Sequence, residues 1–290
     1  MILENYPLEE IDTPLRMWRV SVNEKHQPTI NHRHTNFEIS TVLSGSGVYS
    51  TDKASYPMQK GDVFVFSSNE THCINSVGSA GLEILNLQFK PIYLLGKKRE
   101  SISKEHYNFC FVHSDSFTNR VESEKSEILK NELFAIKNEL IDRDIEYKLA
   151  IKSHVYNIMI ELLRNHKYFQ PVDAQNKLHI KNLKTVILFI DEHFTEKISL
   201  ADLATRCSMS DNHFSYVFKS VFNITPSEYI ISKRLEFAIQ LLISNPDMNM
   251  LDIALQCGFN NSANFNKIFK KYIGTTPSEY RKNSADTIIY

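Results

Sequence analysis

The N-terminal part of the chain carries short runs of β-branched and aromatic residues, separated by turn-forming residues. The clearest runs cover residues 37–43, 47–51, 63–66 and 84–89. Glycines such as Gly45 and Gly61 lie in the turns between them. Short strands at this spacing are typical of a β-sandwich or a small barrel. The pattern therefore predicts a β-domain over residues 1–118.

The pattern changes to helical spacing after this region. Apolar residues recur every three or four positions from Ile128 to Leu163, interrupted by a polar break at residues 142–144. Two helices over 119–168 would carry more apolar surface than one buried face requires. They could pack on the β-domain, on a second copy of the chain, or on both, and we expect them to mediate dimerisation. A polar stretch that contains Pro171 predicts a linker over residues 169–180.

The remaining residues, 181–290, read as helix with clear start signals. Thr225-Pro226-Ser227-Glu228 combines an N-cap threonine, a proline at the first helical position and a glutamate at the third. Thr276-Pro277-Ser278-Glu279 repeats the same signal. Ser199 and Asn249 each precede an aspartate by three residues, which is also typical of a helix start. These signals predict an all-α domain.

The all-α domain contains an internal repeat. The two Thr-Pro-Ser-Glu-Tyr segments lie 51 residues apart, and Phe214 and Phe218 match Phe265 and Phe269 at the same offset. Each repeat reads as a short capped helix, a turn and an amphipathic helix, which predicts two helix-turn-helix motifs. A connecting helix over 226–244 would span roughly 28 Å. This length approaches the ~34 Å between successive major-groove faces on one side of a DNA duplex.

Charge supports DNA binding only locally. The whole chain has 33 Lys+Arg against 34 Asp+Glu, a formal charge of −1. Residues 253–278, however, include three lysines and several asparagines without an acidic residue. Lysine and asparagine suit phosphates and base edges. A solvated Lys/Asn-rich face is the alternative for a single helix, but the repeat favours a double-stranded DNA partner.

The composition also limits the location of the protein. The N-terminus has no basic region followed by an apolar core, and no run is apolar for long enough to span a bilayer. The four cysteines are scattered without a CxxC pair, which fits buried thiols in a reducing compartment. We therefore expect a cytoplasmic protein without a membrane partner.

Residues ~181–283 resemble the DNA-binding domain of the AraC/XylS family of bacterial transcriptional regulators. The most specific matching stretches are residues 253–259 and 269–281, and residues 234–242 fit the connecting helix of the family. The resemblance implies that both recognition helices contact DNA and that the regulator contacts RNA polymerase. The implied base-reading residues are Asn212, Ser215 and Tyr216 on the first helix, and Ser262, Ala263, Asn266 and Lys267 on the second. Lys219 and Lys270 are the implied phosphate contacts.

The β-domain contains a candidate polar cluster. His32, His34 and Glu38 would face one side of a strand, and His72 from another strand would complete a set suited to a divalent metal. This spacing resembles the two motifs of the cupin fold over residues ~25–90. The second motif departs from the cupin pattern, because Ser67 stands for the usual proline and Asn69 for the usual glycine.

Three interpretations of this cluster stay open. The residues could form the site of a metal-dependent enzyme, or a metal-bound or metal-assisted sensor. In the interpretation that we favour, they line a pocket and hydrogen-bond a small effector, because cupin-like domains of AraC-type regulators resemble cupins down to these histidines. Trp18 could then offer a flat face to a sugar ring, although a strand aromatic is more often part of the core. A barrel filled by its own side chains would instead indicate a regulator without an effector.

Together these features predict an α+β protein of two domains. A cupin-like effector-sensing barrel over 1–118 and a helical pair over 119–168 precede an AraC-type DNA-binding domain over 181–290. We expect a homodimeric, effector-responsive transcriptional activator that is not an enzyme and needs no cofactor. The effector-binding candidates are His32, His34, Glu38, His72 and Trp18.

Overall fold

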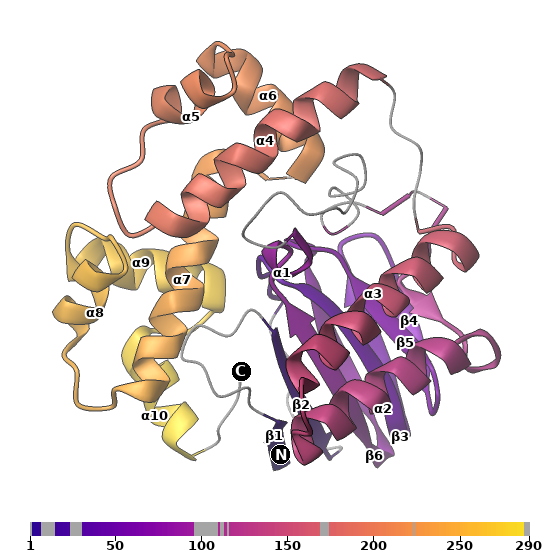
Figure 1. Ribbon diagram of the computed structural model, residues 1–290. Helices are drawn as coiled ribbons and strands as arrows, with labels where there is room; N and C mark the ends of the chain where they lie inside the picture. Colours follow the sequence, from indigo (N-terminus) through magenta and orange to yellow (C-terminus); the bar gives the residue numbers. More distant parts are fainter. Residues whose placement is uncertain are drawn as a thin grey trace. The chain divides into compact units, whose positions relative to one another are not determined.

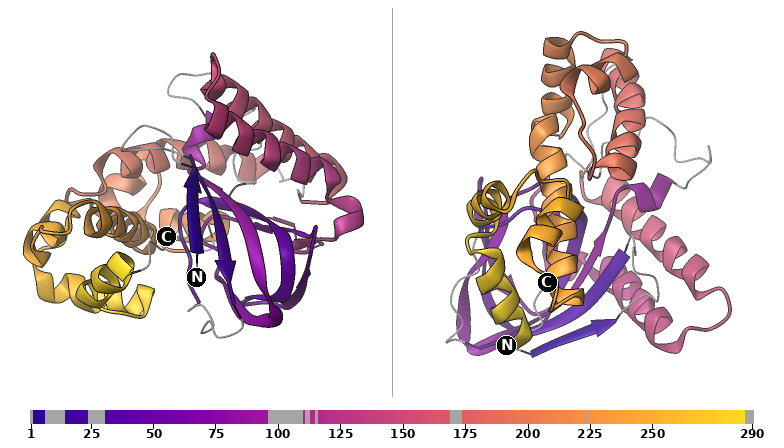
Figure 2. Two further views of the ribbon diagram at one scale, coloured as in Figure 1. Left: turned by 90° about the horizontal axis from the view of Figure 1, so that it is seen from below. Right: turned by 90° about the vertical axis from the view of Figure 1, so that its left-hand side faces the viewer.

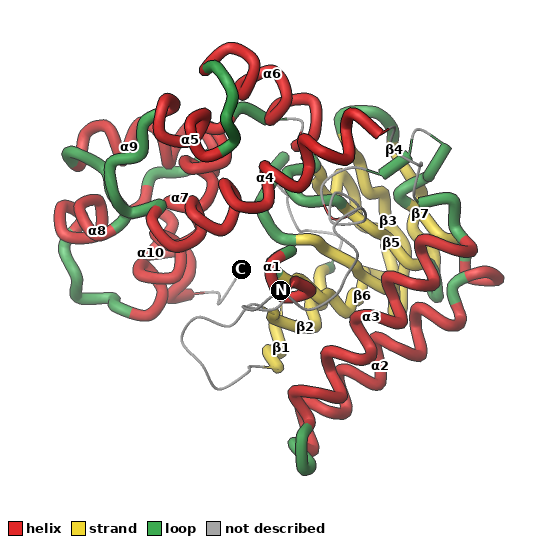
Figure 3. Tube along the Cα trace, turned by 45° about the horizontal axis from the view of Figure 1, so that its top comes forward, coloured by secondary structure: helices red, strands yellow, loops and turns green. Residues whose placement is uncertain are grey.

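A computed structural model describes residues 2–6, 15–23, 31–95, 110, 113–114, 116–168, 174–222 and 224–286. The chain forms two compact units, Met1–Val172 and Asp173–Tyr290. Strands occur only in the described part of the first unit, and the described part of the second is helical (Figure 3). Helix α4 begins at Ala174, so the linker expected over 169–180 is helical from that residue onwards. Residues 169–173 of the expected linker lie outside the described residues.

The first unit is built on one antiparallel sheet of seven strands in the order β1-β2-β6-β3-β5-β7, with β4 paired to β3 (Figure 1). The strands are β1 (Ile2–Tyr6), β2 (Leu15–Val22), β3 (Phe37–Thr51), β4 (Ser55–Gln59), β5 (Val63–Phe66), β6 (His72–Phe89) and β7 (Arg120–Val121). Strand β7 pairs with β5, so the sheet continues to Val121, three residues beyond the boundary expected at residue 118. The cupin-like β-domain predicted from the sequence is thus present as this antiparallel sheet.

The two long strands, β3 and β6, pair along most of their length and bend together. Their register shifts between Val42 and Ser44 and again after Gly45. Such bulges bend a strand and increase its twist. Gly45 has a φ of +80°, and a Cβ at this position would overlap the carbonyl oxygen of Gly81. The close approach of these two backbones explains why only glycine fits there.

Alternation along the strands divides the sheet into two faces. On one face, Phe37 stacks on Phe89 at 5.0 Å between ring centroids. The opposite face carries Glu38 beside Gln88 and Ser40 beside Asn86 in cross-strand register. These four polar side chains are buried. The polar face therefore holds Glu38, one of the candidate effector residues, inside the unit.

The predicted helical pair is present as α2 (Glu127–Asp142) and α3 (Tyr147–Asn165), which pack side by side along the sheet (Figures 1 and 2). Arg143, in the polar break, ends α2 in a left-handed conformation with φ +53°. Leu133, Ile136 and Val155 are among the fully buried residues of the pair. A one-turn helix α1 (Ile92–Leu95) and a 3-10 turn η2 (Ser123–Lys125) complete the described first unit.

The second unit contains the two predicted helix-turn-helix motifs. The first is α5 (Leu200–Arg206) and α6 (Asp211–Phe222), and the second is α8 (Met250–Gln256) and α9 (Ser262–Ile273). Helix α7 (Pro226–Ser244) joins them, preceded by α4 (Ala174–His193) and followed by α10 (Pro277–Asp286). Buried Phe265 and Phe269 anchor α9 on a core shared with α7 and α8. No helix in the described ranges is both long and apolar enough to cross a membrane.

Candidate functional site

The two recognition helices expose one face and bury the other. On α6, Phe214 and Phe218 are fully buried, whereas Tyr216 is 73% exposed. On α9, Phe265 and Phe269 are fully buried. The aromatic positions that revealed the repeat therefore fasten both helices to the protein, and the opposite faces are free to contact a partner.

The residues predicted to contact DNA lie on these free faces. On α6, Asn212, Tyr216 and Lys219 are exposed and Ser215 is partly buried. On α9, Ala263, Asn266, Lys267 and Lys270 are exposed and Ser262 is partly buried. Positions 212, 215, 216 and 219 correspond one by one to 263, 266, 267 and 270. Both sets follow i, i+3, i+4, i+7 spacing, which places each set on a single side of its helix.

The two faces differ in charge. Helix α9 carries Lys267, Lys270 and Lys271 and no acidic residue. Helix α6 begins with Asp211 and has Lys219 in its last turn. A phosphate backbone would therefore meet a uniformly positive surface on α9 and a mixed one on α6. The difference favours α9 as the stronger electrostatic contact.

The turns before the recognition helices have matching geometry. Ser208 and Gly258 are both left-handed, with φ values of +54° and +80°. In each turn the residue that follows donates its N–H to an alanine of the preceding helix, Met209 to Ala204 and Phe259 to Ala254. Both bonds satisfy carbonyls at the end of the short helix. The two turns therefore begin in the same way, although the second is one residue longer before its recognition helix starts.

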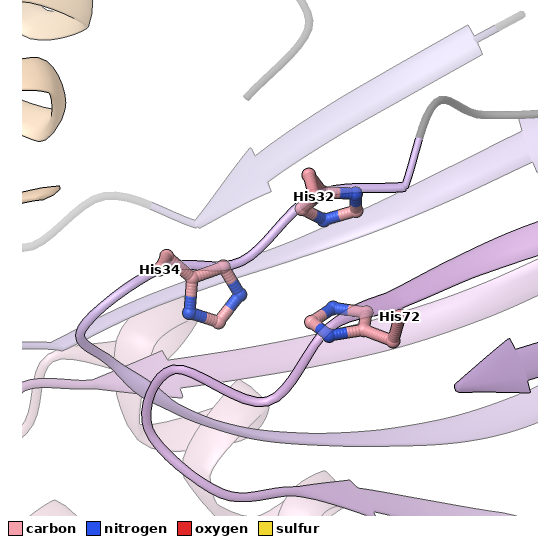
Figure 4. Close-up of side chains that lie close together, drawn as sticks. All are labelled: His32, His34 and His72. Atoms are coloured by element: carbon pink, nitrogen blue, oxygen red, sulfur yellow. The ribbon is translucent and has the colours of Figure 1, made fainter. Parts of the chain in front are cut away.

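The candidate histidines of the first unit also come together. His32, His34 and His72 each offer a ring nitrogen, and these atoms all lie within 4.8 Å of one another (Figure 4). The prediction that His32 and His34 share a strand with Glu38 is wrong, because β3 begins only at Phe37. His32 instead forms an isolated β-bridge with His72, through two backbone hydrogen bonds of 3.0 and 3.2 Å. The backbone pairing of His32 with His72, rather than alternation along one strand, therefore brings these histidines together.

Glu38 contacts two of these histidines, and His32, His34, His72 and Glu38 are called the histidine cluster here. Its Oε2 is 2.9 Å from Nε2 of His34 and 3.5 Å from Nε2 of His72. Burial alone would raise the pKa of Glu38, but hydrogen bonds from the two histidines lower it well below its usual range. Burial would likewise lower the pKa of His72, whereas the hydrogen bond and charge of Glu38 raise it. The interaction between Glu38 and His72 therefore shifts the two pKa values in opposite directions.

The outer ring nitrogens of two histidines are already engaged. Nδ1 of His34 lies 3.1 Å from the carbonyl oxygen of Asn36, and Nδ1 of His72 lies 2.9 Å from that of Glu70. A carbonyl only accepts hydrogen bonds, so each Nδ1 carries the proton and donates. The Nε2 atoms therefore face the cluster. Nε2 of His72 is buried and has no hydrogen-bond partner of normal geometry within the described part of the chain.

This arrangement fits a divalent cation. Metal-bound histidines usually donate their second ring N–H to a carbonyl or carboxylate, as His34 and His72 do here. The three imidazoles and the Glu38 carboxylate form a nitrogen and oxygen donor set that suits zinc and similar metals. The same atoms are equally able to hydrogen-bond a polar organic molecule, so geometry alone leaves both uses open.

Gln88 is a member of the site that the sequence did not reveal. Its Oε1 accepts hydrogen bonds from Arg16 Nε at 2.8 Å and Asn36 Nδ2 at 3.3 Å, so its amide NH2 group must point the other way. That group donates to Glu38 Oε2 at 2.5 Å and lies 2.8 Å from His34 Nε2. Gln88 therefore connects the cluster to the guanidinium of Arg16.

Two further polar atoms on the same face lack partners. Ser40 Oγ and Asn86 Oδ1 are buried without a hydrogen bond to any described residue. The two residues are cross-strand neighbours, and Asn86 also pairs with Trp18. Unsatisfied buried polar atoms are uncommon and call for a ligand, water or ion. The alternation of polar residues at 38, 40, 86 and 88 within apolar strands is the sequence signal that could have identified them.

Trp18 lies beside this polar row rather than in the histidine cluster. It is half-buried on β2, packs against the interior core that contains Phe64 and Phe66, and has the Arg16 guanidinium 4.8 Å from its ring centre. Phe66 stacks on His72 at 4.2 Å. The polar face therefore combines hydrogen-bonding groups with aromatic rings.

Known proteins share both halves of this arrangement. A profile of the helix-turn-helix domain matches residues 203–283, and a profile of the cupin domain matches residues 17–87. The transcriptional activator RhaR of Mannheimia succiniciproducens is 23% identical over 273 residues, which cover 90% of this chain and 91% of the relative. The melibiose operon regulatory protein of Escherichia coli K12 is 23% identical over 267 residues, covering 89% and 85%. The chain belongs to the AraC family of transcriptional regulators.

The fold of this AraC-family regulator also matches a solved structure over nearly its whole length. Unsaturated fatty acid-bound ToxT from Vibrio cholerae strain SCE256 gives a TM-score of 0.60 at 14% identity and covers 94% of this chain and 97% of that chain. The likeness shows that the two proteins share a two-domain fold, as the sequence predicted. The exposed faces of α6 and α9 lie within the matched helix-turn-helix domain, and the polar face of the sheet lies mainly within the matched cupin domain.

Proposed function

We propose that this AraC-family regulator is an effector-responsive activator that reads DNA with the exposed faces of α6 and α9. The observation that carries this proposal is the position-by-position match between the two faces, with Asn266 and Lys267 exposed on an acid-free helix. Asparagine and lysine side chains at such positions suit adenine and guanine edges in the major groove. The protein would then act on DNA in the cytoplasm and contact RNA polymerase.

Selection of binding sites tests this proposal. The full-length protein is incubated with a random duplex library, and bound DNA is recovered and sequenced over several rounds. We expect a motif with two conserved blocks about 10 base pairs apart, one for each recognition helix. Recovery of random sequence, or of a motif that Asn266→Ala and Lys267→Ala leave unchanged, would argue against base reading by these helices.

The proposed effector is a small polyhydroxylated molecule of sugar-like chemistry, bound at the polar face of the sheet. Its hydroxyl groups would satisfy Ser40 Oγ, Asn86 Oδ1 and the histidine cluster, and Trp18 would stack on its apolar side. The name of the melibiose operon regulatory protein places one relative at a sugar operon, whereas ToxT holds a fatty acid. A thermal-shift screen that includes sugars, fatty acids, bile-like amphiphiles and metals compares these classes directly, because a bound ligand raises the melting temperature.

Asn86→Ala supplies the matched test for the polar row. It removes one unsatisfied buried atom of the apo protein, so stability should change little while the response to a sugar ligand is lost. Asn75→Ala, on the exposed part of β6, is the control that should retain the response. A sugar-induced shift that persists in Asn86→Ala would place the effector elsewhere.

We also propose that the protein is a homodimer assembled through the outer faces of α2 and α3. These helices expose a set of large apolar side chains, each at least 39% exposed: Ile128, Phe134, Ile141, Leu149 and Ile160. Phe134 and Ile141 are seven residues apart on α2, and Leu149 and Ile160 are eleven apart on α3, so each pair lies on one side of its helix, as an interface would require. Analytical ultracentrifugation should show a dimer that Ile141→Glu and Leu149→Glu dissociate. A monomer at micromolar concentration, with and without DNA, would contradict this assignment.

A metal-responsive regulator is the second candidate, favoured by the convergence of the ring nitrogens of His32, His34 and His72 within 4.8 Å of one another. His32, His34, His72 and Glu38 would hold the ion, and a bound cation would neutralise the buried carboxylate. Metal analysis of the purified protein, together with zinc titration of wild type and His34→Ala, separates the two candidates. Stoichiometric metal that changes DNA affinity favours the metal sensor. Turnover of a small substrate would instead support a cupin enzyme, contrary to our proposal that the protein is no enzyme and needs no cofactor.

A further inference from the structure

A five-residue loop, 67–71, connects β5 to β6 and contacts both the histidine cluster and Tyr168. Its first three residues, Ser67, Ser68 and Asn69, are each at most 6% exposed. Asn69 has a φ of +65°, a conformation that asparagine tolerates better than most residues. The loop is therefore a buried and sharply turned segment rather than a surface connection.

One end of the loop is bonded to the histidine cluster. The backbone N–H of Asn69 donates to the carbonyl oxygen of His34 at 2.7 Å, and Nδ1 of His72 donates to that of Glu70 at 2.9 Å. Ser68 Oγ donates to the carbonyl oxygen of Thr35, next to His34, at 2.6 Å. A shift of the His72 imidazole therefore pulls directly on the loop backbone, and the backbone around His34 holds the loop from the other side.

The other end of the loop is bonded to Tyr168. The hydroxyl groups of Ser67 and Tyr168 lie 2.8 Å apart. The Ser67 N–H donates to Glu70 Oε2 at 2.9 Å, which couples the first residue of the loop to the residue that His72 contacts. A proline at position 67, usual in the cupin pattern, would remove both bonds. The departure from that pattern thus creates the connection.

Tyr168 is fully buried and closes the C-terminal end of α3. Lys167, with φ +54°, turns the chain inwards, and the tyrosine ring packs on Phe117 at 4.7 Å and on Phe37 at 6.1 Å. The Tyr168 carbonyl oxygen accepts a hydrogen bond from the Ser114 N–H at 2.9 Å. Four residues later, at Val172, the first unit ends. Tyr168 therefore fixes the last described segment of this unit, four residues before the unit ends.

We infer that the loop of residues 67–71 relays the state of the histidine cluster to Tyr168, and through Tyr168 to the segment that leads into the DNA-binding unit. The inference rests on the proposed function, because it describes how occupancy of the polar face changes DNA binding. The contacts form one unbroken path from His72 through Glu70 and Ser67 to Tyr168. Physical coupling along such a path requires that a change at one end alters the stability of the other.

Hydrogen exchange of the full-length protein tests the relay without an effector or DNA. The perturbation is His72→Gln, which removes the donor at the Nδ1 position; His72→Asn keeps an amide donor there. We expect His72→Gln to speed exchange of the Ser114 and Tyr168 amides about three- to tenfold, and His72→Asn much less. In a Ser67→Ala background, the additional effect of His72→Gln should fall below about twofold, since the path is already broken.

A second perturbation and a matched control keep the result interpretable. Glu38→Gln changes the cluster from β3 without touching the loop and should reproduce the effect if His72→Gln folds poorly. Ser50→Ala removes another buried hydroxyl, which pairs with Ser55 at 2.6 Å outside this path, and should leave the coupling intact. Unchanged exchange at Ser114 and Tyr168, or equal acceleration with and without the Ser67 hydroxyl, would overturn the relay.

DNA affinity then tests the final step. With a duplex obtained by selection, His72→Gln should change the dissociation constant several-fold in the wild-type background and not in Ser67→Ala. A change in hydrogen exchange without a change in affinity would show that the relay stops at Tyr168. Failure of the wild-type protein to select any duplex would instead refute the proposed function and leave the exchange result standing.

Discussion

Ser208 and Gly258 occupy the same turn position in the two helix-turn-helix motifs, and both are left-handed, with φ of +54° and +80°. Their surroundings differ. A Cβ at Gly258 would overlap the carbonyl oxygen of Thr195, a backbone atom that cannot rotate away. Ser208 is exposed and accommodates its side chain. The second motif therefore packs more closely on the chain before α5 than the first motif's equivalent position does.

We predict that Gly258→Ala lowers the stability of the protein by about 1–3 kcal/mol, because left-handed strain adds to the overlap with Thr195. Calorimetry of the full chain measures the shift in apparent Tm. Ser208→Gly is the matched control and should change stability by less than about 1 kcal/mol, since relief of strain opposes the added chain entropy. Equal effects of the two substitutions would show that packing at Gly258 is looser than described.

Substitutions on α9 should separate base reading from phosphate contact. We expect Asn266→Ala and Lys267→Ala each to weaken binding to a selected duplex by ~1–3 kcal/mol with little change in Tm, because both side chains are exposed. Lys270→Ala should weaken binding to all sequences similarly and lower the salt slope by about 1. Fluorescence anisotropy over a range of salt concentrations distinguishes the two effects.

The control for this series is Lys125→Ala, an exposed lysine of the first unit with a side chain that is 73% exposed. It should leave both affinity and salt slope unchanged. Tyr216 is the α6 counterpart of Lys267, and Tyr216→Ala should cost affinity only at the half of the site that α6 contacts. A uniform loss from Lys267→Ala across all sequences would make this residue a phosphate contact instead.

The helix caps of the repeat should contribute measurable stability. Thr276 Oγ1 accepts the N–H of Glu279 at 3.3 Å, while the Thr276 N–H donates to the Glu279 carboxylate at 2.9 Å. Thr276→Ala should therefore cost about 1 kcal/mol. Ser278→Ala, in the same first turn of the helix but exposed, should be nearly neutral. Urea unfolding followed by circular dichroism measures both; equal midpoints would argue that the cap contributes nothing.

The buried pair of His113 and Glu70 predicts a pH dependence of stability. Nε2 of His113 lies 3.2 Å from Oε1 of Glu70. Burial lowers the pKa of His113, but the hydrogen bond and charge of Glu70 outweigh it and raise the pKa above the usual value. Because the folded-state pKa is the higher one, this stabilisation is complete below about pH 6.5 and is lost as pH rises through the raised value.

Burial tends to raise the pKa of Glu70, yet hydrogen bonds from partners including His113 lower it, so its stabilisation is lost only in acid. We therefore expect the Tm of wild type to fall as the pH rises from about 6 to about 8, a range that begins near the usual histidine pKa of about 6.5 and extends above it. The Tm of His113→Gln should fall less over the same range. His193→Gln is the control, since its pair with Glu196 is largely exposed. A pH profile that His113→Gln leaves unchanged would contradict the assignment.

The sequence by itself determined the features that depend on local order. Helix starts at Thr225 and Asn249 followed from capping side chains, which act within three residues. The repeat predicted which faces of α6 and α9 are buried, because a helix places every third or fourth residue on one side. The same local signals did not fix the end of the linker, because α4 already begins at Ala174.

Only the tertiary structure decided which distant side chains meet. Strand alternation predicts the face of a residue but not its neighbour across the sheet, so the Gln88–Glu38 pair depended on the register of β3 and β6. His32 reached the cluster through a bridge to His72 rather than through its own strand. Ser67 and Tyr168 lie 101 residues apart along the chain. Their contact depends on the fold that buries both, and no local periodicity encodes a meeting of that kind.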